Sequence, residues 1–156
     1  MKLLFKQRPF TWFDSYDIYK EDGWTAYTVK GKLSWGHRLE IYDSYDQHIG
    51  TVQERVFSFL PKFEIYIREE YMGEIRKEFT FLKPVFQLEC NDWRVEGDYL
   101  QWNYKVVNKH GSLIMTAEKE ILRMTDTYVM DIVNEEDSLL CLMIVLAIDA
   151  AKCTQS

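Results

Sequence analysis

Ten consecutive apolar residues, Leu139 to Ile148, lie near the end of this 156-residue chain. In a helix these residues would present apolar side chains on every side, and such a helix must be enclosed on every side. At a rise of about 1.5 Å per residue the run spans roughly 15 Å, about half the hydrocarbon thickness of a bilayer. Asp149 then ends the run. We therefore predict a helix that is enclosed by protein, and no transmembrane segment.

The residues before the apolar run indicate where this helix begins. Asn134 is a suitable N-cap, and Glu135, Glu136 and Asp137 would place their carboxylates at the positive end of the helix dipole. The sequence thus predicts a central helix over about residues 135–152, within the usual uncertainty of element ends.

A three-residue pattern recurs before the helix. Its copies are Asp17-Ile18-Tyr19, Glu40-Ile41-Tyr42, Glu64-Ile65-Tyr66 and the looser Gln87-Leu88-Glu89, at steps of 23, 24 and 23 residues. A period of this size indicates a supersecondary unit that is used several times. After each of the first three copies comes a polar turn with Gly, which permits the positive φ of tight hairpins, and then a strand of alternating character.

Two further hairpins are predicted after the repeat. One turns at Gly97-Asp98 between strands at 93–96 and 100–104, and the other turns at Asn108–Gly111. We count roughly ten to twelve short strands over about residues 3–133. A barrel of this size needs something to fill its lumen. The predicted fold is therefore mainly β: one domain over residues 1–156, in which a closed antiparallel barrel of meander repeats surrounds the buried C-terminal helix.

Four segments of the chain resemble the LURP-one-related family, and the likeness runs over nearly the whole chain. They are residues 12–19, 29–37, 59–66 and 142–151, of which the last is the most specific. The resemblance, which includes uncharacterised bacterial members, implies a tubby-like fold, a closed barrel threaded by its C-terminal helix. Tubby proteins bind phosphoinositides, but no segment here matches their lipid-binding residues. Phospholipid scramblases look like distant relatives, but their cysteine-rich segment and calcium loop have no counterpart here, so we predict no scramblase activity.

Charge and cysteine content narrow the class of partner and the compartment. The net charge is -6 and the isoelectric point is about 5.1. Nucleic-acid binding requires a basic face that displaces counterions, so we expect no nucleic-acid partner. Cys90, Cys141 and Cys153 are widely spaced and odd in number, which is typical of reduced thiols in the cytoplasm. We read no targeting segment at the start of the chain.

Motifs for catalysis, cofactors and metals were sought without success. His37, His48 and His110 fall in separate turn regions with no partner at ligand spacing, so we interpret them as surface residues. Cys141 is interpreted as a small core residue. Asp149 has two interpretations: a hydrogen-bonded carboxylate at the barrel mouth, which we favour, or a perturbed group in a ligand pocket. We predict no catalytic residue, cofactor or metal site.

Alternate connections of a meander fall on the same end of a barrel, and this sorts the charged and aromatic residues. One end would carry the carboxylates of Glu21, Asp22, Asp43, Asp46, Glu69 and Glu70. The other end would mix aromatic, aliphatic and basic side chains, which suit a lipid–water interface. Our first hypothesis is a non-enzymatic protein that binds anionic phospholipid or phosphoinositide peripherally. The candidate residues are Trp35, Arg38, Phe59, Leu60, Lys62, Phe81, Leu82 and Lys83.

Three alternatives to this hypothesis remain open. The rings of the candidate residues could fold inward and plug the barrel, with the cations simply solvated. The chain could instead be a protein-interaction module that uses the barrel wall near Arg94, Glu96 and Lys105. An enzyme with a substrate at the barrel mouth is the least favoured function, because the helix fills the lumen that a substrate would need.

Overall fold

The computed structural model describes residues 1–6, 15–32, 34–79, 84–88, 91–122 and 125–154. Within these residues twelve strands form a closed barrel, in which strands adjacent in sequence pair antiparallel and the first strand closes against the last. The strands are β1 (Lys2–Lys6), β2 (Ser15–Lys20), β3 (Thr25–Lys32), β4 (Arg38–Tyr42), β5 (His48–Glu54), β6 (Lys62–Ile67), β7 (Glu70–Phe79), β8 (Pro84–Leu88), β9 (Trp93–Asp98), β10 (Asn103–Val107), β11 (Leu113–Leu122) and β12 (Thr125–Ile132). The predicted barrel is confirmed.

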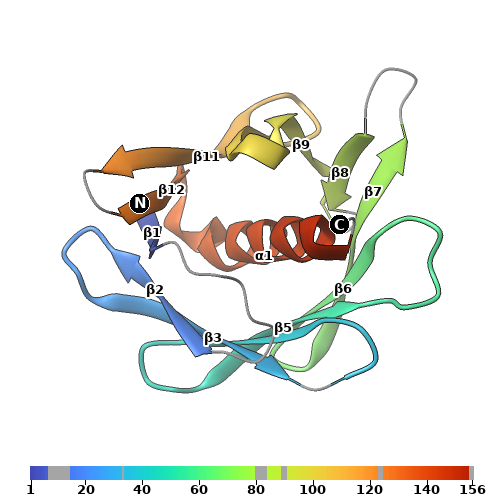
Figure 1. Ribbon diagram of the computed structural model, residues 1–156, viewed down its shortest axis with the longest axis horizontal. Coiled ribbons are helices and arrows are strands. Elements are labelled where there is room, and N and C mark those ends of the chain that lie inside the picture. Colours follow the sequence, from blue (N-terminus) through green and yellow to red (C-terminus); the bar gives the residue numbers. More distant parts are fainter. Residues whose placement is uncertain (7–14, 33, 80–83, 89–90, 123–124, 155–156) are drawn as a thin grey trace.

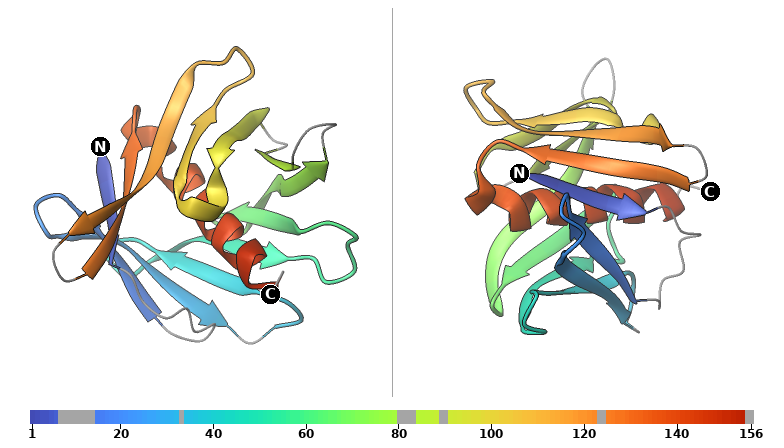
Figure 2. Two further views of the ribbon diagram at one scale, coloured as in Figure 1. Left: turned by 45° about the horizontal axis from the view of Figure 1, so that its top comes forward. Right: turned by 90° about the vertical axis from the view of Figure 1, so that its left-hand side faces the viewer.

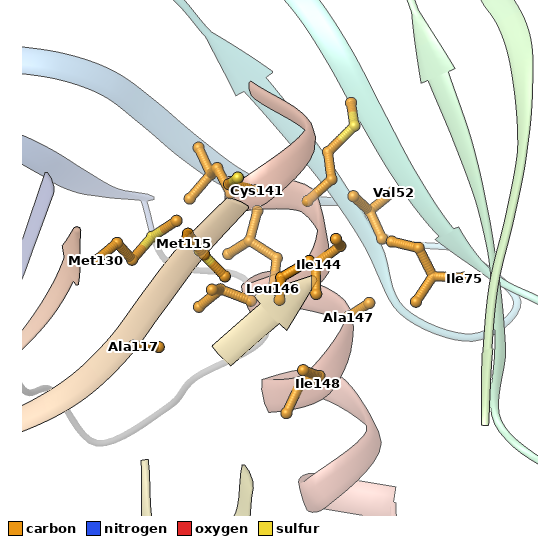
Figure 3. Packing of buried hydrophobic residues seen from close by; sticks show 14 of the residues in the cluster. Val52, Ile75, Met115, Ala117, Met130, Cys141, Ile144, Leu146, Ala147 and Ile148 are labelled. Carbon is orange, nitrogen blue, oxygen red and sulfur yellow. The ribbon is translucent and has the colours of Figure 1, made fainter. Parts of the chain in front are cut away.

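The apolar helix passes through the middle of this barrel (Figures 1 and 2). α1 (Ser138–Thr154) follows a 3-10 turn, η2 (Glu135–Asp137). From Cys141 to Ile148 no residue is more than 1% exposed, whereas Leu139 and Leu140 are only partly buried. Figure 3 shows side chains of the helix packed between residues of strands on opposite walls, such as Val52 of β5 and Met115 of β11. The prediction of an enclosed helix is confirmed, with Cys141 as a core residue.

Two details of the prediction were wrong, and local hydrogen bonds explain both. Asn134 is extended but its side chain caps nothing, because a 3-10 turn intervenes and the α-helix begins at Ser138. The hairpin predicted at Gly97-Asp98 instead turns one step later, through η1 (Tyr99–Gln101). The Asp98 carboxylate accepts a hydrogen bond from the Gln101 amide at 3.3 Å and so caps this 3-10 turn.

The three-residue repeat has a simple structural meaning. Its central residues Ile18, Ile41 and Ile65 are 0% exposed and face the helix side of the wall. The flanking residues point outward, where the Tyr42 hydroxyl donates to Glu40 Oε2 at 2.8 Å and the Tyr66 hydroxyl donates to Glu64 Oε2. Each of these three copies therefore supplies one core residue, and the second and third copies also supply a hydrogen-bonded pair on the outer wall.

The barrel wall is not equally paired all the way round. Among the described residues, β1 and β2 pair only at Leu3↔Lys20 and Leu4↔Tyr19. β8 and β9 likewise pair only at Gln87↔Arg94 and Leu88↔Trp93. The β1–β12 ladder, by contrast, joins five residue pairs. The barrel thus consists of two extensively paired sheets, β2–β8 and β9–β12 with β1, which meet at two short seams.

Helix burial can be tested by truncating one of its side chains. Leu146 is 1% exposed, so Leu146→Ala should lower the free energy of unfolding by about 2–5 kcal/mol through lost contacts and a residual cavity. Leu100, which is 57% exposed, is the matched control, and Leu100→Ala should change stability by no more than about 0.5 kcal/mol. Chemical denaturation measures both values. Equal effects of the two substitutions would contradict an enclosed helix.

Candidate functional site

The meander separates the connections into two ends of the barrel. The β3–β4 and β5–β6 connections lie on the same side as the C-terminus of α1 (Figure 1). We call residues 34–37 and 55–61 the aromatic loops and this end the aromatic end. The β2–β3, β4–β5 and β6–β7 connections lie at the opposite end, where α1 begins, and we call it the acidic end.

The aromatic loops hold their rings out into solvent. Trp35 is 85% exposed, Phe57 is 99% exposed and Phe59 is 97% exposed. The alternative in which these rings fold inward is therefore wrong for Trp35 and Phe59. Such fully exposed rings cost hydrophobic free energy unless something covers them, and they mark an interaction surface more strongly than scattered aliphatic residues do.

The backbone of the aromatic loops is held by strand β5 and by β6. The Glu54 amide donates to the His37 carbonyl at 2.7 Å, and the His37 amide donates to Glu54 Oε2 at 3.0 Å. The Arg55 amide donates to the Lys62 carbonyl at 2.9 Å and closes the base of the second loop. The loops are therefore anchored at their bases while their rings remain free.

The two aromatic loops also contact each other. Gly36 has a φ of +81°, which favours glycine, and a Cβ placed there would lie 3.0 Å from Cγ2 of Val56 and 3.2 Å from the Glu54 carbonyl oxygen. Nε2 of the Gln53 side chain, on β5, donates to the Trp35 carbonyl at 3.2 Å. The three exposed rings therefore lie on two loops that contact each other.

Cations flank both aromatic loops, but most of them are paired. Lys32 and Arg38 share Glu40, at 4.0 and 3.4 Å. Arg55 bridges Glu64 at 3.5 Å and Glu74 at 3.1 Å. Lys62 makes no ion pair with any residue that the structure describes. Among the described residues on the outside of this end, Lys62 is thus a cation without an ion-pair partner, whereas Lys32, Arg38 and Arg55 are paired.

The predicted lipid-binding residues fall into three groups. Trp35 and Phe59 are exposed, and Arg38, Leu60 and Lys62 are half-buried close to them. Phe81, Leu82 and Lys83 lie outside the described residues. Phe57 and Arg55 were missed by the prediction, although Phe57 lies two residues from Phe59 in the same predicted connection.

The predicted acidic end is present, and the helix entrance extends it. Glu135, Glu136 and Asp137 add to the six carboxylates of the turns. Trp24 and Tyr45 are also exposed at this end, at 75% and 84%, so exposed aromatic residues are found at both ends. Charge, rather than aromatic content, distinguishes the two ends.

A hollow of about 340 Å³ opens at the acidic end, beside the start of α1. The half-buried residues Tyr27, Ile49 and Leu139 line it, and the Tyr27 hydroxyl lies 2.6 Å from Ser138 Oγ. Burial raises the pKa of Tyr27, and the nearby Glu135 carboxylate raises this pKa further. The hydroxyl groups of Tyr27 and Ser138 are thus hydrogen-bonded to each other within the protein.

Asp149 lies in the mouth of the barrel at the aromatic end. Its carboxylate accepts a hydrogen bond from Trp102 and lies 3.8 Å from Lys152 Nζ, which in turn sits 5.3 Å from the centroid of the Trp102 ring. Burial nevertheless raises the pKa of Asp149 to about 6. These contacts fit the favoured interpretation, a hydrogen-bonded carboxylate at the barrel mouth.

One lysine points into the barrel at this end. Lys77 alternates with Ile75 on the inward side of β7 and is 8% exposed. Burial lowers the pKa of Lys77, and its ammonium group lies 5.9 Å from the centroid of the Tyr99 ring. Lys77 is therefore withdrawn from the outer surface.

The barrel wall near Arg94 carries a second hollow, of about 500 Å³, lined by residues that include Glu96, Tyr104 and Lys105. Arg94 Nε lies 2.9 Å from Glu96 Oε1, and Lys105 Nζ lies 3.7 Å from Glu96 Oε2. The residues named for a protein interaction thus form one ion-pair network. The hydrogen bond from Arg94 is the main reason that the pKa of Glu96 is lowered.

Two of the three histidines, His37 and His48, are half-buried, contrary to the prediction of surface residues. Burial lowers the pKa of His37, whose Nδ1 lies 2.5 Å from Glu54 Oε2. His48 Nε2 lies 2.9 Å from both the Gly50 carbonyl and Thr51 Oγ1. Both are half-buried, whereas His110 is exposed as expected. Within the described part of the chain, no group of three His, Cys, Asp or Glu residues is arranged to hold a metal ion.

Comparison with known proteins identifies the chain's relatives. A family model described as LURP-one-related matches residues 1–149. The uncharacterized protein YxjI of Bacillus subtilis (strain 168) is 29% identical over 150 residues, which cover 96% of this chain and 92% of that protein. No solved structure matches the chain significantly. None of the helices in the described ranges is long and apolar enough to cross a membrane.

The raised pKa of Asp149 predicts a pH-dependent stability. The folded protein holds this proton more tightly than the unfolded chain, whose Asp pKa is about 3.9, so the stabilisation is lost as the pH rises towards 6. Relative to Asp149→Asn, the wild-type free energy of unfolding should fall by about 2 kcal/mol between about pH 4 and pH 7, allowing for partial solvation. Urea titrations across this range measure the difference.

A neutral surface substitution provides the control for this titration. Leu100 is 57% exposed and has no titratable group, so the difference between Leu100→Ala and the wild type should not change with pH. A difference between wild type and Asp149→Asn that stays constant with pH would contradict the raised pKa.

Proposed function

We propose that this chain, which belongs to the LURP-one-related family, is a non-enzymatic binding protein that attaches peripherally to anionic phospholipid through its aromatic end. The observation that carries the proposal is the full exposure of Trp35, Phe57 and Phe59 on two loops that touch. Tryptophan and phenylalanine rings are favoured at the lipid–water interface, where they leave water without entering the hydrocarbon centre.

The anchoring of the aromatic loops favours this attachment. Because strands β5 and β6 already fix the loop bases, insertion of the rings would order little additional backbone. Burying a phenylalanine or similar side chain contributes up to about 1.5–3 kcal/mol. Three rings entering the interface together would supply reversible peripheral binding.

The distribution of charge favours one orientation at an anionic surface. The acidic end would be repelled and would point away from the membrane, whereas most described cations of the aromatic end are ion-paired and Lys62 is not. A basic group near an anionic leaflet contributes about 1 kcal/mol. We infer a cytoplasmic protein, for which the anionic cytoplasmic leaflet is the natural partner.

The packing of α1 argues against a substrate site inside the barrel, because side chains occupy the lumen along the helix. A protein-interaction module remains the second candidate, supported by the hollow of about 500 Å³ on the wall near Arg94, Glu96 and Lys105. Such a module would retain its partner in Phe57→Ser/Phe59→Ser and lose it in Lys105→Glu. Affinity purification with these two variants distinguishes it from lipid binding.

Removing the rings should weaken membrane binding. Phe57→Ser/Phe59→Ser should lower affinity for vesicles of phosphatidylcholine and phosphatidylserine by about tenfold or more, because two exposed phenyl groups no longer enter the interface. Sedimentation of the protein with vesicles at low and high salt measures the affinity. The fold should be unaffected, since neither ring contributes to the core.

Trp24 supplies the matched control, because it is an exposed aromatic residue at the acidic end. Trp24→Ser should bind vesicles as the wild type does. The proposal fails if the wild type does not sediment with anionic vesicles at low salt, or if Trp24→Ser and Phe57→Ser/Phe59→Ser are weakened equally.

A further inference from the structure

Strands β6 and β7 place two cations directly opposite each other beside the second aromatic loop. The register pairs Lys62 with Arg76, and the next pair along, Phe63 and Ile75, points into the core. Side chains in directly opposed positions have Cβ atoms about 4.5–5.5 Å apart, and like charges so placed are destabilising. A cation pair in this position requires a compensating anion.

Neighbouring carboxylates compensate this pair only in part. Glu64 and Glu74 are both engaged by Arg55. Glu78 Oε1 lies 3.0 Å from Arg76 Nε. Lys62 forms no ion pair with a carboxylate of the described residues. The two cations thus face one carboxylate between them, which leaves a local excess of positive charge.

The Arg76 guanidinium also has an unsatisfied donor. Its Nε is buried and makes no hydrogen bond among the described residues, because the approach of Glu78 is close but poorly aligned. Buried donors are normally satisfied, and an orphan on a charged group is costly. Arg94 makes an instructive comparison: it has the same spacing to Glu96, yet its Nε does form a hydrogen bond, at 2.9 Å.

We propose that Lys62 and Arg76 form a binding subsite for a phosphate group, a role that rests on the proposed lipid function when the phosphate belongs to a headgroup. A phosphate accepts hydrogen bonds from a guanidinium and an ammonium group simultaneously and supplies the missing negative charge. The position fits a membrane ligand, because Lys62 is the first residue of β6 and directly follows the second aromatic loop. The last residue of that loop is held in place by the bond from the Lys77 amide to the Pro61 carbonyl, at 3.1 Å.

The variant that tests this subsite is Lys62→Gln/Arg76→Gln in the full-length protein. Its affinity for vesicles of phosphatidylcholine with phosphatidylserine should fall about tenfold or more, given the contribution of each basic group. Its weak binding to vesicles of phosphatidylcholine alone should stay as in the wild type, because the rings are retained. Removing like charges that face each other should leave its melting temperature unchanged or slightly raised.

Arg94→Gln is the matched control. Arg94 lies on β9, two strands from Arg76, where it is ion-paired with Glu96 and opposite the neutral Gln87 on β8. This variant should bind both kinds of vesicle as the wild type does. A second arm uses inorganic phosphate: the rise in melting temperature on adding phosphate should be larger for the wild type than for Lys62→Gln/Arg76→Gln, because binding to the folded state stabilises it.

The outcomes separate the subsite from the lipid function. If Lys62→Gln/Arg76→Gln binds anionic vesicles like the wild type and responds equally to inorganic phosphate, the subsite is overturned while lipid binding by the rings stands. If no protein binds vesicles but only the wild type shows the larger phosphate response, the subsite stands with a free phosphate ligand and the lipid function fails. Equal loss in Arg94→Gln would overturn the subsite in favour of nonspecific charge.

Discussion

The rest of the structure depends on the burial of one apolar helix. A helix that is apolar on all sides cannot face water anywhere, so the chain must surround it. The barrel does so from every direction, and in return the helix fills a lumen that twelve strands alone would leave empty. Because both surfaces gain by leaving water, the hydrophobic effect drives barrel and helix to assemble as one unit.

This arrangement confines function to the outside and to the two ends. The side walls are covered by hydrogen-bonded and ion-paired side chains such as Glu40 with Tyr42 and Arg94 with Glu96. The ends differ in charge because the turns and the helix entrance gather carboxylates at one of them. In a barrel built from a repeated two-strand unit, every second connection comes from the same part of the repeat and lies at the same end. The repeat therefore gives the two ends different side chains.

The sequence was sufficient for the architecture because its signals were periodic. The Ile of each repeat and the uninterrupted run in α1 left few other ways to bury apolar surface. The sequence did not predict local details that depend on single hydrogen bonds, such as the helix start near Asn134 and the turn after Asp98. The candidate surface was found in part, since Trp35 and Phe59 follow from strand alternation and connection length. Arg76 was missed because its significance lies in register with Lys62, and register depends on pairing across strands.

The two short seams have a consequence for synthesis on the ribosome. β1 is synthesised before β2–β11, yet its extensive partner is β12, which follows all of them, and α1 comes after β12. Until then the nascent chain is an open, curved sheet whose apolar face has nothing to cover it. Such exposed surface invites chaperone binding or premature association between chains. The apolar face of the sheet therefore gains its cover only once α1 has been synthesised, and a chain lacking α1 would leave this face exposed.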